Sequence, residues 1–270
     1  MNDYDYWKKQ GLVPLFKEVD TEEPEQRRFA GKLLVIGGNK GAFFAVANAL
    51  KVAHEMGVGE VRALMPSSLK NQVPSTPEVY FAEAETSGTF GKNALNEMLI
   101  QSEWADVVVL IGDTGKNAET SVAFAELMKR CEKPIFLTRD AVDAAIPDVM
   151  NWGTLREVET NLLLTVPQLQ KMLRTLYYPK VITLSMPTNQ LIETLHKFTI
   201  SYPKICLTTF HNSQLIVAQN GEVVTEELGD TNWTQITLWG GALAVYMAVL
   251  RVWNLNIIGY KVASTALIYK

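Results

Sequence analysis

The 270-residue sequence contains only two cysteines and three histidines. Cys131 and Cys206 show no CxxC spacing, and no histidine stands beside either of them. Zinc sites and disulfide frameworks need clusters of such residues. The sequence therefore predicts no metal site, and we expect both cysteines to be reduced core residues, as is typical of a cytoplasmic protein.

Positive charge and long apolar segments are also scarce. Lys and Arg number 25 against 29 Asp and Glu, which gives a net charge of −4 and an isoelectric point near 5.5. This balance argues against nucleic acid as the main partner, because nucleic-acid-binding proteins usually carry a basic surface.

The most apolar run, Ile236–Trp253, is interrupted by Thr237, two glycines and Arg251. A membrane span needs roughly 20 predominantly apolar residues, so we expect a buried helix and no membrane partner.

Several catalytic and phosphate-binding motifs are missing. The sequence contains no GxSxG, HExxH or DxDxDG pattern. The loop Gly37-Gly38-Asn39-Lys40-Gly41 is not GxGxxG. The loop Gly112-Asp113-Thr114-Gly115-Lys116 lacks the glycine spacing of a P-loop, and Asn117 stands where Ser or Thr would follow the Lys. The polar, acidic first residues also differ from a secretory signal, so we expect a cytoplasmic protein.

What the sequence does contain is a regular alternation of short apolar runs and amphipathic segments. The apolar runs predict buried strands at 32–36, 60–65, 106–111, 134–137 and 161–164. The segments between and after them predict helices over about 43–53, 93–100, 119–130, 168–176 and 189–198. A strand, a crossover helix and a second strand form a right-handed parallel unit, so the alternation indicates a parallel sheet covered by helices.

The pattern changes near Lys204. Short strands are predicted at 205–208 and 214–218, and Asn220-Gly221 predicts a hairpin turn before a third strand at 222–224. Two helices over about 234–253 and 255–269 are predicted to end the fold. We therefore predict one three-layer α/β sandwich over residues 31–270, with a mostly parallel central sheet and an antiparallel edge late in the chain. Residues 1–30 are predicted to form an arm that docks on this body or on a neighbouring subunit.

Two glycine-containing turns and one carboxylate are the candidate ligand sites. Trp239-Gly240-Gly241-Ala242 opens an apolar helix, and the unpaired N–H groups of such a first turn favour anions. The Gly37–Gly41 loop lies where a backbone phosphate cradle is expected, although a tight strand–helix turn explains its glycines equally well. Asp140 follows the strand at 134–137, and it is either a cleft carboxylate or an N-cap for the next segment.

Taken together, these segments resemble the ADP/ATP-dependent NAD(P)H-hydrate dehydratases, a branch of the ribokinase-like superfamily. The similarity runs from about Gly31 to Tyr269 and is strongest over Gly31-Lys-Leu-Leu-Val-Ile-Gly-Gly-Asn39. Residues 134–140 are similar to the strand that ends in the DAD-like turn of the family, with the second Asp retained. Residues 232–246 align with the segment that ends in a GSGD or GTGD signature. The resemblance implies a ribokinase-like fold with a nucleotide site near the end of the sheet.

The resemblance also implies an activity. Members of the family use ATP or ADP to remove water from hydrated NADH or NADPH through a phosphorylated hydrate, with the signature Asp as base. The implied cofactors are ATP or ADP and Mg, the implied partner is a nucleotide or NAD(P)H-type small molecule, and a homo-oligomer is expected. The implied nucleotide- or phosphate-binding residues are Gly240, Gly241, Thr208 and Asn212. The implied substrate-binding residues are Gly38, Asn39, Gly41 and Asp140.

The sequence departs from the family where the chemistry takes place. Ala242 occupies the position of the signature Asp, so no catalytic residue is predicted there. The KGxxT motif appears as Thr208-Thr-Phe-His-Asn-Ser213 without its Lys, and the TPHPGE-like loop as Leu164-Thr-Val-Pro-Gln-Leu169 without its His and Glu. The glycine-rich GPGLG loop is shortened to Gly112-Asp-Thr-Gly115.

The loss of a positioned general base typically costs about 10²–10⁴ in rate. Asp113, Asp140 and Asp230 are the acidic residues that are candidates to replace it, and no motif places any of them beside a phosphate. Two functions follow. One is a divergent dehydratase whose activity is weak or lost, and the other is a catalytically inactive nucleotide- or dinucleotide-binding or structural homologue.

Overall fold

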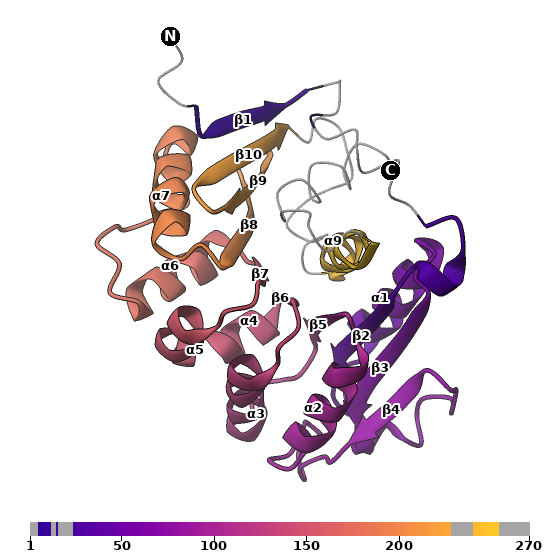
Figure 1. The fold of residues 1–270 in the computed structure, drawn as a ribbon. Coiled ribbons are helices and arrows are strands. Elements are labelled where there is room, and N and C mark those ends of the chain that lie inside the picture. The colour runs from indigo at the N-terminus through magenta and orange to yellow at the C-terminus, as the bar shows by residue number, and fades with distance from the viewer. Residues whose placement is uncertain (1–4, 12–14, 16–23, 228–239, 254–270) are drawn as a thin grey trace.

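The computed structural model describes residues 5–11, 15, 24–227 and 240–253. These residues form a three-layer α/β sandwich around a ten-stranded sheet with the order β1-β10-β9-β8-β7-β6-β5-β2-β3-β4 (Figure 1). The strands are β1 (Trp7–Gln10), β2 (Lys32–Gly37), β3 (Glu60–Pro66), β4 (Val79–Ala82), β5 (Val107–Gly112), β6 (Ile135–Thr138), β7 (Thr160–Leu163), β8 (Ile205–His211), β9 (Gln214–Gln219) and β10 (Glu222–Glu227). The predicted fold class is confirmed.

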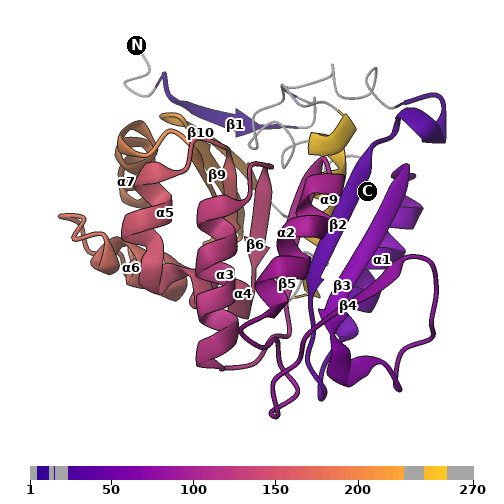
Figure 2. The ribbon, with the colours of Figure 1, turned by 60° about the horizontal axis from the view of Figure 1, so that its bottom comes forward.

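Helices cover both faces of the sheet. The helices are α1 (Phe44–Glu55), α2 (Ala94–Trp104), α3 (Ala118–Arg130), α4 (Asp140–Ala145), α5 (Val149–Leu155), α6 (Val166–Thr175), α7 (Thr188–Ser201) and α9 (Ala242–Trp253), with short 3₁₀ turns η2 (Arg27–Phe29), η3 (Ser67–Leu69) and η4 (Ile146–Asp148). The apolar residues of α1 and α9 pack on one face, and those of α2 to α7 pack on the other. Figure 2 shows α2 in front of β2, β3 and β5.

The central strands are apolar on both faces, as the sequence predicts for a parallel sheet. In β2, Leu33 and Val35 face the α1 and α9 layer, while Leu34 and Ile36 face the opposite layer. All residues of β5 are buried. Because helices cover both faces, alternation between polar and apolar residues disappears in these strands.

The antiparallel part of the sheet lies late in the chain, over β8, β9 and β10. Two-residue turns join these strands, and both residues of each turn have positive φ: 48° and 59° at Asn212-Ser213, and 50° and 81° at Asn220-Gly221. Such turns match the twist of a hairpin, and the predicted turn at Asn220-Gly221 is confirmed. Beyond them, β1 pairs in parallel with β10 and forms the edge of the sheet.

Side-chain contacts hold the described part of the N-terminal arm on this edge, among them an ion pair between Lys8 and Glu222 at 3.3 Å. Trp7 Nε1 donates a hydrogen bond to Thr225 Oγ1 at 2.9 Å. The ring of Tyr6 stacks on the ring of His196 with 3.6 Å between centroids. Residues 7–10 therefore dock on the body of their own chain.

The helix α9 begins at Ala242, later than the predicted helix over 234–253. Residues 234–239 and the predicted helix over 255–269 lie outside the described residues. Arg251, which interrupts the apolar run, forms an ion pair with Glu159 at 2.9 Å and so joins the end of α9 to the start of β7. No described helix has the length and apolar character that a membrane crossing requires.

Candidate functional site

Three loops meet at the carboxyl ends of β2, β5 and β6, the edge where open α/β sheets bind ligands. The first two loops are in direct contact, because Gly38 N donates a hydrogen bond to Gly112 O at 2.8 Å. A Cβ atom at Gly37 would lie 2.5 Å from the same carbonyl oxygen. Glycine at position 37 is thus required by close packing between the loops, whether or not a ligand binds there.

The Asp140 carboxylate organises the loop that follows β5. Its oxygens accept hydrogen bonds from Asp113 N at 2.8 Å, Thr114 N at 2.8 Å and Gly115 N at 3.1 Å, and from the Thr114 hydroxyl at 3.0 Å. Successive N–H groups of this kind form a concave anion-binding site, and here the anion is a side chain of the same chain. The sequence allows two interpretations of Asp140, a cleft carboxylate or an N-cap. It is the first residue of α4, yet its carboxylate binds the neighbouring loop.

Asp113 fills a second anion position. Its Oδ2 accepts a hydrogen bond at 3.0 Å from Ala45 N in the first turn of α1, and its Oδ1 pairs with the Arg139 guanidinium. Both side chains are largely buried, with exposed fractions of 9% for Asp113 and 18% for Arg139. The partial positive charge at the N-terminus of α1 is therefore balanced by an internal carboxylate. A bound phosphate is not required at that position to balance it.

The loop after β2 is closed by hydrogen bonds of its own. Asn39 Oδ1 accepts a hydrogen bond from Gly41 N at 2.7 Å, and Asn39 Nδ2 donates to the Asp113 carbonyl oxygen. Gly38 has φ of +89°, a conformation that favours glycine. The structure thus brings the four predicted substrate-binding residues, Gly38, Asn39, Gly41 and Asp140, into one cluster of contacting loops.

A cavity of about 520 Å³ lies beside this cluster, at the start of α3. Its charged lining consists of Lys116, Asp140, Asp143 and Lys171, and Lys171 Nζ lies 3.2 Å from Asp143 Oδ1. Two positive and two negative side chains balance, so the cavity has no strong preference for an anion or a cation.

Gln168 stands within the segment that corresponds to the TPHPGE-like loop, and its side chain is fully occupied. Its amide nitrogen donates to Arg139 O at 2.8 Å and to Asp143 Oδ2 at 2.9 Å. Its amide oxygen accepts from Thr165 N at 3.0 Å, which completes a capping box at the start of α6. This segment therefore joins α6 to α4.

The paired glycines lie at the start of α9, on the same edge of the sheet. Gly241 has φ of +76°, and a Cβ atom there would lie 2.5 Å from Ile111 Cδ1 at the end of β5. The carbonyl oxygen of Gly240 accepts a hydrogen bond from Asn48 Nδ2 of α1 at 3.2 Å. No acidic residue lies in the first turn of α9, and Ala242 is its first residue.

The two remaining predicted residues lie farther along the sheet. Thr208 belongs to β8, is 1% exposed, and has a hydroxyl without a hydrogen-bond partner among the described residues. Asn212 lies in the exposed turn after β8, and its amide donates to Thr188 Oγ1 at 3.0 Å. In the strand order, β7 and β6 separate β8 from β5. The described contacts join Gly240 to α1 and place Gly241 beside the end of β5, and none of them reaches Thr208 or Asn212.

Sequence reasoning missed the roles of Arg139, Gln168 and Asn48. Asn48 carried a detectable signal, because it is a polar residue close to the buried face of α1 that Ala45, Ala49 and Val52 define. Gln168 carried one too, because Thr165-Val-Pro-Gln168 fits the Thr-x-x-Gln pattern of a capping box. Arg139 carried none, since its partner Asp113 lies 26 residues away in the sequence. Among the residues that the structure describes, no three His, Cys, Asp or Glu side chains converge on a metal position.

No protein-family model matches the chain. A segment of 116 residues is 33% identical to the bifunctional NAD(P)H-hydrate repair enzyme of Methanothermobacter thermautotrophicus, and the match covers 42% of this chain but only 22% of that enzyme. The sequence resemblance to this group of enzymes is thus confirmed, over a part of each chain.

Solved structures extend the comparison to the whole fold. A ribokinase-like superfamily protein from Enterococcus faecalis V583 superimposes with a TM-score of 0.62 at 13% identity, over 98% of this chain and 95% of the other. The ADP/ATP-dependent NAD(P)H-hydrate dehydratase of Bacillus subtilis, co-crystallised with ATP and Mg²⁺, gives a TM-score of 0.58 at 12% identity, over 95% and 86%. The chain therefore has the ribokinase-like fold.

Proposed function

Because the chain has the ribokinase-like fold and resembles the NAD(P)H-hydrate dehydratases, we propose that it is a divergent relative that binds a nucleotide or an NAD(P)H-type dinucleotide with weak or no dehydratase activity. The proposal depends above all on Ala242, which begins α9 where the family signature has its Asp. It has a binding half and a catalytic half, and each half is tested separately.

The binding half rests on the start of α9. The first N–H groups of this 12-residue helix lack intrahelical partners and favour an anion such as a nucleotide phosphate. No described atom lies within 4 Å of a Cβ built at Gly240, so none of the described residues blocks that position. Because backbone groups would hold the phosphate, this contact does not depend on the side chains that the sequence has lost.

Magnesium fits this position less well. Mg²⁺ is usually bound by one or two carboxylates together with phosphate oxygens. The first turn of α9 has no acidic residue, and the described oxygens of Asp113 and Asp140 already accept hydrogen bonds from the backbone. The described residues therefore supply no ready magnesium ligand beside Gly240.

The catalytic half rests on the engagement of the candidate bases that the structure describes. Asp113 and Asp140, two of the three candidate replacements, are engaged with the Arg139 guanidinium and with backbone N–H groups. Asp230, the third, lies outside the described residues. A carboxylate that holds two loops together is poorly placed to accept a proton from a substrate, because proton transfer requires a lone pair directed at the reacting group.

Turnover and ligand binding test the two halves. Purified protein is incubated with hydrated NADH or NADPH and with ATP or ADP, and the recovery of the reduced nicotinamide is measured. We expect no recovery from the natural chain and detectable recovery from Ala242→Asp, in which a carboxylate stands at the signature position. Rapid turnover by the natural chain would show that the catalytic half is wrong.

Thermal denaturation tests the binding half. ATP, ADP, NADH or NADPH is expected to raise the melting temperature, since a ligand that binds only the folded state stabilises it. Gly240→Ala is expected to remove this shift without unfolding the protein, and Gly11→Ala, which also adds a methyl group where no described atom lies within 4 Å, is the matched control. Flat melting curves with all four ligands would leave only a structural role.

A further inference from the structure

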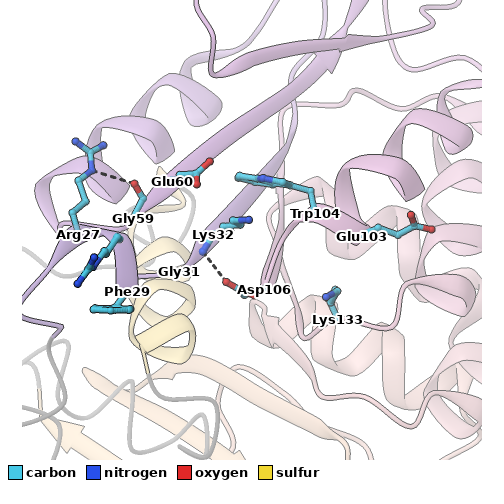
Figure 3. Close-up of a pocket in the computed structure, with 11 residues that line it drawn as sticks. Arg27, Phe29, Gly31, Lys32, Gly59, Glu60, Glu103, Trp104, Asp106 and Lys133 are labelled. Atoms are coloured by element: carbon cyan, nitrogen blue, oxygen red, sulfur yellow. Dashed lines mark hydrogen bonds between the residues drawn. The ribbon is translucent and has the colours of Figure 1, made fainter.

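A second cavity, of about 630 Å³, lies at the opposite edge of the sheet from the loop cluster (Figure 3). It is formed where β2, β3, β5 and β6 begin, together with η2 and the end of α2. The lining residues are Arg27, Arg28, Phe29, Gly31, Lys32, Gly59, Glu60, Glu103, Trp104, Asp106 and Lys133. We call this cavity the amino-edge cleft. Its volume falls within the range of roughly 300–1,000 Å³ that small-molecule sites occupy.

Four cationic side chains from three separate segments line the amino-edge cleft: Arg27 and Arg28 from η2, Lys32 from β2, and Lys133 before β6. None of the four forms an ion pair with any described residue. Arg139 at the carboxyl edge behaves differently, since it pairs with Asp113. The cleft therefore concentrates positive charge that the chain does not neutralise by direct contact.

The carboxylates of the cleft do not cancel this charge. Asp106 Oδ2 accepts a hydrogen bond from the backbone N of Lys32 at 2.9 Å and so fixes the start of β2 against β5. Glu60 and Glu103 are exposed, and Figure 3 shows them on either side of Lys32 and Asp106. The lining thus carries four cations against three carboxylates, and one of these carboxylates, Asp106, already accepts a backbone N–H.

Aromatic rings hold two of the cations in place. The Lys32 ammonium lies 5.7 Å from the centroid of Trp104, and the Arg28 guanidinium lies 4.6 Å from the centroid of Phe29. Arg62 lies 3.8 Å from the centroid of Trp104 and adds further positive charge beside the cleft. A cation–π contact orders a cation and leaves its full charge available to a ligand.

From this arrangement we propose that the amino-edge cleft binds a small anion that carries two or more phosphate or carboxylate groups, with Arg28, Lys32 and Lys133 as its charged contacts. The cations come from three separate segments, and a molecule with several anionic groups can pair with more of them than a single phosphate can. The proposal is independent of the nucleotide site, because none of the lining residues belongs to the loop cluster or to the start of α9.

Calorimetric titration at low salt tests the proposal, with pyrophosphate and citrate as probes and inorganic phosphate as the single-anion comparison. We expect pyrophosphate or citrate to bind at one saturable site and inorganic phosphate to bind more weakly. In the double variant Lys32→Gln with Lys133→Gln, the affinity is expected to fall about tenfold or more. The control, Lys51→Gln with Lys92→Gln, removes the same charge from exposed positions outside the cleft and is expected to retain the affinity.

Two further variants locate the bound probe. A change of tryptophan fluorescence on titration with pyrophosphate is expected to disappear in Trp104→Phe. Gly240→Ala is expected to leave pyrophosphate binding unchanged, which separates this site from the proposed nucleotide site. Absence of saturable binding, equal weakening in both double-lysine variants, or loss of binding in Gly240→Ala would each overturn the proposal.

Discussion

Asp113 and Arg139 form an ion pair in which both residues have positive φ, 58° for Asp113 and 60° for Arg139. Non-glycine residues rarely adopt this conformation, which costs on the order of 1–3 kcal/mol for each residue. The surrounding contacts hold the strained backbone in place, since Asp113 also binds Ala45 N and its own N–H is bound by Asp140. Strain of this kind is often found at functional sites, and here it lies at the carboxyl edge of the sheet.

Two variants of Arg139 separate the ion pair from the backbone strain. Arg139→Ala leaves the largely buried Asp113 carboxylate without its partner, and we expect a loss of about 2–3 kcal/mol in the free energy of unfolding. Arg139→Gly loses the same ion pair but relieves the strain, so it is expected to be about 1 kcal/mol more stable than Arg139→Ala. Urea denaturation measures both. Equal stability of the two variants would show that the backbone at Arg139 is not strained.

Asp140→Asn is expected to destabilise the protein substantially. The substitution removes one of two carboxylate oxygens that together accept four hydrogen bonds, and it introduces an amide donor facing backbone N–H groups. We expect a loss of about 2–3 kcal/mol, which corresponds to a fall of roughly 5–10 °C in melting temperature for a chain of this size. The control is Asp143→Asn, which alters an exposed pair with Lys171 and keeps an amide oxygen that can accept from Gln168 Nε2, so it should cost less than about 1 kcal/mol. A similar effect of both substitutions would contradict the assigned role of Asp140.

The paired glycines are expected to respond differently to an added methyl group. Gly241→Ala places a Cβ 2.5 Å from Ile111 Cδ1 at a residue with φ of +76°, so a loss of about 2 kcal/mol is expected. Gly240→Ala meets no described atom within 4 Å and should change the free energy of unfolding by less than about 0.5 kcal/mol. Denaturation curves of the two variants make the comparison, and a larger effect at Gly240 would refute it.

Glu226 predicts a pH dependence of stability. Burial raises the pKa of its carboxyl group from 4.5 to about 7 in the folded protein. Between these two pH values the folded state holds a proton that the unfolded state releases, so this group stabilises the protein less as the pH rises. Because Glu226 is only half-buried, solvent screening limits the effect to the order of 1 kcal/mol.

Glu226→Gln is therefore expected to be more stable than the natural chain at pH 8, and this advantage should shrink steadily as the pH falls toward 4.5. Glu227→Gln, which changes the exposed neighbouring residue, serves as the control for the lost charge. Urea denaturation across this pH range gives the difference between each variant and the natural chain. A pH-independent difference for Glu226→Gln would argue against the raised pKa.

Much of the fold was predictable because its strands are short and its helices are amphipathic. The all-apolar β5 is recognisable from sequence because helices cover both of its faces. Four elements were missed, β1, β4, α4 and α5, which have between 4 and 7 residues. The first two are the edge strands of the sheet and are largely half-buried, so they show neither a continuous apolar run nor a clean alternation.

The site was predictable only in part. The glycines at 38, 41, 240 and 241 are visible in the sequence, and the structure places them at the carboxyl edge as expected. The engagement of Asp140 by the loop at 113–115 was not predictable, because it depends on β5 and β6 being neighbours and on the backbone conformation of Arg139. A single sequence does not distinguish a carboxylate that binds a ligand from one that binds a loop of its own chain. Whether Gly240, Gly241, Thr208 and Asn212 bind a nucleotide stays a prediction.

The pairing of β1 with β10 has a consequence for how the protein is made. Trp7 lies opposite Val223, so β1 can pair with its neighbour only after β2 to β9 and β10 have been synthesised. Until then the backbone N–H and C=O groups of β1 have no strand to pair with. The outer edge of β10 is likewise unpaired until β1 docks on it. The ladder between β1 and β10 therefore closes late in synthesis, and a substitution at Trp7 or Val223 would act directly on this closing step.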